Sequence, residues 1–199
     1  MTASNYHTRI IFRFFNAHLK KNYVKVYSSI TDEEKISMGK VIIEGIGACF
    51  IILLVCVIGI ANGAVGLVHM YEKDVRDRAI ELELTTEKKI KRNAALFKLV
   101  GMLSLLVYVL VSVYAVNGVM NFLDGFWQIS VIMLMEGIFD RLFIDWYWVG
   151  KTKAWDIPGT EDLKPYIYGK SLVVKWIVTL VGYPLIAAML SGIMLLFVK

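Results

Sequence analysis

The sequence predicts an all-α integral membrane protein, with four transmembrane helices in a bundle and an N-terminal amphipathic interfacial helix. Of its 199 residues 57% are apolar, whereas a soluble domain is typically about 45–50% apolar. Charged residues make up 20% of the chain and gather in blocks between long apolar runs. Apolar runs of about 18 residues or more are typical of helices that cross a membrane.

Residues 1–40 form the first predicted unit, an amphipathic segment without a span. Apolar and aromatic residues between Arg9 and Tyr27 recur at helical spacing, and basic residues fall largely on the other side. This pattern predicts an interfacial helix that lies on anionic lipid. The alternative is a helix that covers the ends of the spans or contacts a partner.

The second predicted unit, residues 41–199, holds the four spans. They are predicted at about residues 41–68, 95–120, 126–149 and 171–198. The first has a rise of about 42 Å against a hydrocarbon core of about 30 Å, so it must tilt or project from the membrane. Glu44, Lys98 and Lys175 lie near span ends, where a charged group can reach the interface.

Small residues and one proline predict how the spans pack. Gly59 and Gly63 in the first span, and Ala187 with Ser191 and Ala188 with Gly192 in the fourth, form small-xxx-small patterns. Such faces allow close helix packing within the bundle or in a homodimer. Pro184 is expected to interrupt the fourth helix and free a carbonyl group nearby.

Two charged connections are expected on the same side of the membrane. Residues 69–93 mix both charges and are rich in helix formers, which predicts that the first two spans continue into water as a helical hairpin. Residues 150–170 contain the turn Pro158-Gly159, and Thr160 begins a short predicted helix. This loop is interpreted as a lid over a cavity, or alternatively as an interfacial turn.

The balance of basic residues predicts the orientation. The side with residues 71–94 and 150–170 holds eleven lysines and arginines, against eight on the side of the two termini. Because basic loops stay in the cytoplasm, we expect both connections to be cytoplasmic in a multi-pass protein of the cell membrane.

The third span is unusual because it carries four ionisable residues: Glu136, Asp140, Arg141 and Asp145. Tryptophans concentrate at membrane interfaces, and Trp127 and Trp146 lie about 29 Å apart along a helix. This spacing places Glu136 near the middle of the membrane and Asp145 at its rim.

Helical spacing predicts how these groups are arranged. Glu136 and Asp140 are four residues apart and are expected to share one face, while Arg141 and Asp145 pair on the next. Ionisable residues inside a span are costly, so they indicate a ligand-binding or proton-coupled site by default. The structural alternative is an ion cluster of Asp140, Arg141 and Asp145 that locks the span to its neighbours. In that case Glu136 forms a hydrogen bond with Asn62, Ser104 or Tyr108 of an adjacent span.

These observations favour a binding or transport component with a polar intramembrane cavity lined by the third-span carboxylates. One alternative is a membrane-embedded enzyme that uses Asp140, Arg141 and Asp145 on a lipid headgroup or polyprenyl phosphate. Another is a non-catalytic accessory or scaffold subunit of a membrane complex.

Other functions have little support in the sequence. The chain has no P-loop, dinucleotide-binding fingerprint, HExxH motif or nucleophile elbow, and only three histidines. We therefore expect no cofactor and no metal site. A net charge of +5 without a soluble basic domain fits a bilayer with anionic lipids better than nucleic acid. The small-residue faces are also compatible with a homodimer or, together with the basic helix, with a membrane partner subunit.

Overall fold

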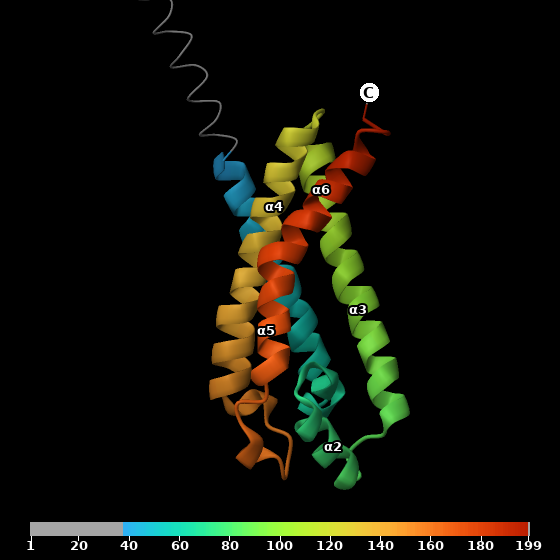
Figure 1. The fold of residues 1–199 in the computed structure, drawn as a ribbon, viewed down its shortest axis with the longest axis vertical. Coiled ribbons are helices and arrows are strands. Elements are labelled where there is room, and N and C mark those ends of the chain that lie inside the picture. The colour runs from blue at the N-terminus through green and yellow to red at the C-terminus, as the bar shows by residue number, and fades with distance from the viewer. Residues whose placement is uncertain (1–37, 199) are drawn as a thin grey trace, which may run out of the picture. The chain divides into compact units, whose positions relative to one another are not determined.

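The computed structural model describes residues 38–198, and every regular element within them is helical (Figure 1). Four helices are long and apolar enough to cross a membrane, as predicted. We call them spans 1 to 4; they comprise Met38–Ile60, Glu87–Val116, Phe122–Val149 and Gly169–Met194. The amphipathic helix predicted for residues 1–40 falls almost wholly outside the described residues and stays a prediction.

Three spans combine α-helix with π-helix, which the sequence analysis did not predict. Span 2 is α3 (Glu87–Leu110) and η2 (Val111–Val116), span 3 is α4 (Phe122–Phe139) and η3 (Asp140–Val149), and span 4 is α5 (Gly169–Ile177), η6 (Val178–Gly182) and α6 (Tyr183–Met194). The elements η2, η3 and η6 are the π-helices. Such segments are rare and are frequently found at functional sites.

Span 1 ends at Ile60, so the predicted first span, residues 41–68, is wrong at its C-terminal end. Gly63 follows with a φ of 97°, a conformation that interrupts the helix and favours glycine. The chain then forms a 3₁₀-helix, η1 (Ala64–Met70), instead of continuing the α-helix.

The helical hairpin predicted for residues 69–93 is confirmed for span 2, whose helix already includes residues 87–93, and is wrong for span 1, which does not continue into this segment. A separate short helix, α2 (Lys73–Glu81), lies between spans 1 and 2. Span 2 begins only at Glu87, where the Thr86 hydroxyl accepts a hydrogen bond from the Lys89 backbone N–H at 3.3 Å. The N-cap fixes this start and separates α2 from α3.

A second folded layer, which we call the cap, covers one end of the spans. It consists of η1, α2 and residues 150–168, which include the short 3₁₀-helices η4 (Lys153–Trp155) and η5 (Glu161–Leu163). Trp155, Tyr166 and Val75 are fully buried in its core, and the rings of Tyr71 and Tyr166 lie 4.8 Å apart. Figure 1 shows α2 and the connection between η3 and α5 together at this end.

Span 3 is the most enclosed of the four spans and packs chiefly against α6. Ala187 and Ser191 are fully buried, which confirms one predicted small-residue face within the bundle. A Cβ atom added to Gly192 would have no neighbour within 4 Å among the described residues. Gly192 is therefore not at a close contact between helices in this part of the chain. Gly59 contacts Leu67 of η1 instead of another span.

Span 4 leaves α-helical geometry directly before Pro184. The π-helix η6 ends at Gly182, and α6 begins at Tyr183 with the proline in its first turn. Because proline has no N–H to donate, the interruption falls where the sequence predicts it. In Figure 1 the chain changes direction between α5 and α6.

Candidate functional site

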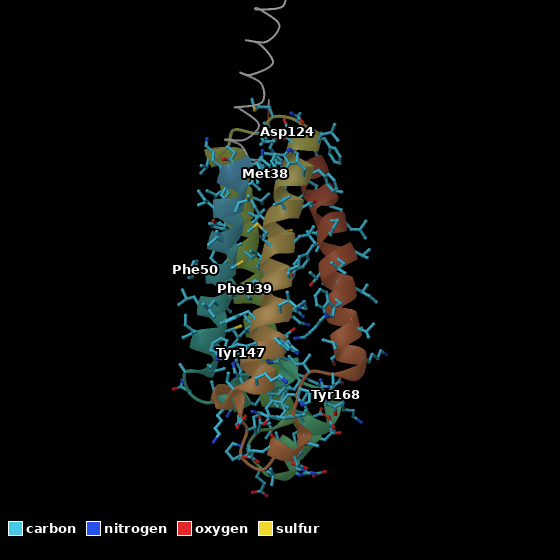
Figure 2. The ribbon with its side chains drawn as sticks, turned by 90° about the vertical axis from the view of Figure 1, so that its left-hand side faces the viewer. Met38, Phe50, Asp124, Phe139, Tyr147 and Tyr168 are labelled. Carbon is cyan, nitrogen blue, oxygen red and sulfur yellow. The ribbon has the colours of Figure 1, made fainter. Side chains whose placement is uncertain are left out.

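The four ionisable residues that the sequence predicts as the site in span 3 are all buried. Glu136, in the last turn of α4, is 2% exposed, and Asp140, Arg141 and Asp145, in η3, are 8%, 7% and 3% exposed. Span 3 is the most enclosed of the four spans, so these side chains are surrounded by other parts of the protein. Figure 2 shows the lower half of this span, from Phe139 to Tyr147, beside the cap.

Arg141 joins the two aspartates. Its guanidinium pairs with Asp140, and Nη1 lies 2.7 Å from Asp145 Oδ2. The predicted Arg141–Asp145 pair is therefore present. The prediction that Asp140 and Arg141 lie on different faces of the helix is wrong, because the two side chains form an ion pair. In a π-helix the backbone hydrogen bonds join residues five apart, so each turn contains more residues than in an α-helix. Each residue is therefore rotated less about the helix axis, and Asp140 and Arg141 lie closer to one face.

Lys175 completes this group from span 4. Its Nζ lies 2.9 Å from Asp145 Oδ1, and its side chain is 20% exposed. The sequence analysis assigned Lys175 to the interface because it lies near the start of its span. The missed signal was that Lys175 is a single cation in an apolar run, and that the second half of the preceding span contains three acidic residues.

The resulting charged network contains Asp140, Arg141, Asp145 and Lys175, two acids and two bases. Burying an isolated charge is costly, so each of these groups depends on its partners. The network thereby ties η3 to α5 electrostatically. Three of its buried atoms have no hydrogen-bond partner among residues 38–198: Asp140 Oδ1, Arg141 Nε and Asp145 Oδ2, the last of which is held only by its ion pair with Arg141.

Glu136 stands apart from the charged network. It forms no ion pair with any described residue, and its Oε2 is buried without a hydrogen-bond partner. The ring of Tyr183 in α6 lies against Gly137, the residue that follows Glu136 in α4. Gly137 makes the approach possible, because an added Cβ would lie 2.7 Å from Tyr183 Cε2.

The predicted partner Tyr108 is engaged elsewhere. Its hydroxyl donates to the carbonyl oxygen of Glu44 at 2.9 Å. The Glu44 side chain in turn accepts a hydrogen bond from Asn117 Nδ2 at 3.0 Å, and the same amide donates to Gln128 Oε1 at 2.9 Å. These contacts link spans 1 and 3 to the connection after span 2.

A pocket of about 350 Å³ lies where the charged network meets the cap. Asp145 lines it, together with Trp146, Lys151, Lys164 and Tyr168. Residues 150–170 thus contribute part of the pocket wall, at the place where the sequence analysis expects the mouth of a cavity. Lys164 is held in this wall by an ion pair with Asp156.

Within residues 38–198 no group of three or more His, Cys, Asp or Glu side chains is arranged to hold a metal ion. Arg141 occupies the space between the two aspartates of η3, so these carboxylates face a guanidinium.

The carboxylate of Glu72 accepts a hydrogen bond from the backbone N–H of Ser171 at 2.9 Å. It therefore stabilises the start of α5.

The fold and the site define a helical bundle with four potential membrane spans and buried charge between two of them. Comparison with protein families, curated proteins and solved structures finds no match. Function is therefore inferred from the fold and its charged residues alone.

Proposed function

We propose that the protein is a multi-pass protein of the cell membrane that binds or transports a small ligand or protons, with Glu136 as the binding group. Large apolar side chains on the outer faces of the spans support the membrane placement; Phe50 is 65% exposed and Met189 66%. Trp146 and Tyr147 are exposed beside the cap, where an aromatic belt would meet the interface.

The observation that carries the proposal is the unpaired carboxyl group of Glu136. Buried carboxyl groups within spans are retained mainly where they face a pathway or bind a proton or ion. The neighbouring charges already compensate one another, so Glu136 is the group whose charge the described residues leave unbalanced. A proton or a cationic ligand would neutralise it.

The charged network and the cap pocket take supporting roles in this proposal. In this proposal the pocket beside the cap, which Asp145 lines, is the side from which a proton or ligand enters. Asp140, Arg141 and Lys175 hold spans 3 and 4 in register around Glu136. Tyr183, which packs against Gly137, forms part of the wall beside the carboxyl group.

Proton binding can be tested directly, because the probe is the proton itself. Infrared difference spectra of the purified protein, recorded between about pH 5 and pH 9, should contain a band from a buried carboxyl group. The Glu136→Gln variant should lose this band. Asp124→Asn, which removes an exposed carboxyl group at the start of span 3, is the control and should keep it.

The same pair of variants tests transport. In proteoliposomes with an internal pH indicator, proton flux should fall at least about tenfold in Glu136→Gln and stay unchanged in Asp124→Asn. A folded Glu136→Gln protein with an unaltered carboxyl band and unaltered flux would refute the role of Glu136.

A further inference from the structure

A groove of about 610 Å³ runs between the end of span 1, η1 and the first half of α3, and we call it the lateral groove. Its long walls are apolar and include Ile58 from span 1 and Leu96 and Val100 from α3. These three side chains are 65%, 53% and 56% exposed, so the groove opens on the outer surface of the bundle. It shares no lining residue with the pocket beside Asp145.

One end of the lateral groove is polar. Asn62, Lys89 and Asn93 line it there, next to the cap. The amide nitrogen of Asn93 donates to the carbonyl oxygen of Gly66 at 3.1 Å, which fixes this side chain at the groove. The ammonium group of Lys89 forms no ion pair with any residue in the described part of the chain.

The charge around this end is strongly positive. The first six residues of α3, 87–92, contain four basic residues and one acidic residue. The acid, Glu87, is engaged by Lys91 at 3.2 Å, so its charge is compensated away from Lys89. Exposed apolar residues follow from Leu96 onwards, and α3 therefore passes from basic to apolar as it would at a membrane surface.

We propose that the lateral groove binds one phospholipid with an anionic headgroup. Its volume is within the range of about 300–1,000 Å³ that ligand sites occupy, and it accommodates a glycerol phosphate with part of one acyl chain. The phosphate lies against Lys89 and Asn62, and the chain lies along Ile58, Leu96 and Val100. This inference rests on the membrane placement proposed above, but not on the role of Glu136.

Native mass spectrometry of the full chain in mild detergent, titrated with phosphatidylglycerol or phosphatidylcholine, tests the headgroup. One phosphatidylglycerol should bind per chain, at least about fivefold more tightly than phosphatidylcholine, because each lysine near a membrane surface favours anionic lipid by about this factor. Lys89→Glu should abolish the preference. Lys88→Glu, one position along the same helix and outside the groove, should retain it.

A matched pair of leucines tests the chain site. Leu96 lines the groove and Leu99 does not, although both are exposed on α3. Leu96→Trp should fill the groove and lower the affinity for phosphatidylglycerol at least about tenfold, whereas Leu99→Trp should leave it unchanged.

Equal binding of the two lipids, or an equal effect of the two tryptophans, would overturn the proposal. So would a spectrum of dimers without lipid, since a second copy would then occupy the groove. Carbonate extraction of cell membranes tests the placement separately. Release of the chain would refute the membrane placement, whereas retention without lipid preference would refute only the groove.

Discussion

At the scale of single residues, Arg141 and Lys175 determine what the carboxylates of span 3 can do. Arg141 contacts both aspartates of η3, and Lys175 adds a second cation to Asp145. Charge is therefore compensated inside the bundle by residues from two spans. Glu136 has no such cation among the described residues, which sets it apart chemically although it lies only one turn from Asp140.

Removal of Lys175 should destabilise the protein because it leaves a buried carboxylate without one of its partners. We expect Lys175→Met to lower the free energy of unfolding by about 3 kcal/mol. Thermal unfolding in detergent measures the effect, with Lys170→Met as the control, since Lys170 is an exposed residue of the same helix.

The double variant Asp145→Asn/Lys175→Met should recover about 1 kcal/mol or more relative to the sum of the single variants, because contacting residues couple. If Lys175→Met were no worse than Lys170→Met, the ion pair would have no role in stability.

At the scale of elements, the site lies where two helices leave α-helical geometry. The π-helix η3 holds three of the four network residues, and η6 lies directly after α5, which carries Lys175. Gly137 of α4 packs tightly against Thr179 of η6 and Tyr183 of α6. The missing side chain of Gly137 therefore allows span 4 to lie close to span 3 beside Glu136.

Gly137→Ala should force the two spans apart. The added Cβ would lie 2.7 Å from Thr179 Cγ2 and from Tyr183 Cε2, so one helix must shift. We expect a loss of about 1–3 kcal/mol in stability and a perturbed tyrosine absorption near Glu136.

Gly192→Ala in α6 is the matched control. Nothing lies within 4 Å of its added Cβ, so helix propensity alone should act and stability should rise by up to about 1 kcal/mol. Equal unfolding temperatures for the two variants would contradict the close approach at Gly137.

At the scale of the whole molecule, the cap packs against the ends of the spans. His69 of η1 is the one histidine among residues 38–198, and its ring packs edge-on against Phe97 of span 2 at 5.4 Å. Burial, with a smaller contribution from the positive charge of Lys98, lowers the pKa of His69 to about 4. The contact between the cap and span 2 therefore depends on a neutral imidazole.

This lowered pKa predicts how stability changes with pH. Between about pH 6.5 and pH 4 the unfolded chain binds a proton that the folded protein excludes, so stability should fall as the pH falls through this window. His69→Phe keeps the ring packing and should lose fewer degrees of unfolding temperature than the native chain between about pH 7.5 and pH 5. An identical loss in both proteins would show that His69 does not contribute.

The sequence alone determined the helical class, the four apolar spans and the unusual charge of the third. These features follow from local hydropathy, since every span-length segment carries its own apolar signal. It also predicted the Arg141–Asp145 pair, because four residues are one turn of a helix. Glu136, Asp140, Arg141 and Asp145 as functional residues stay a prediction.

Only the tertiary structure decided which groups meet. Lys175 is 30 residues from Asp145 in the chain, and no periodicity within either helix encodes their contact. The cap, the end of span 1 at Ile60 and the π-helical turns likewise depend on packing between segments that are distant in sequence. Hydropathy determines which segments form the spans, whereas contacts between spans decide which buried ionisable groups have an ion-pair partner. Among the described residues, Asp140 and Asp145 have one and Glu136 has none.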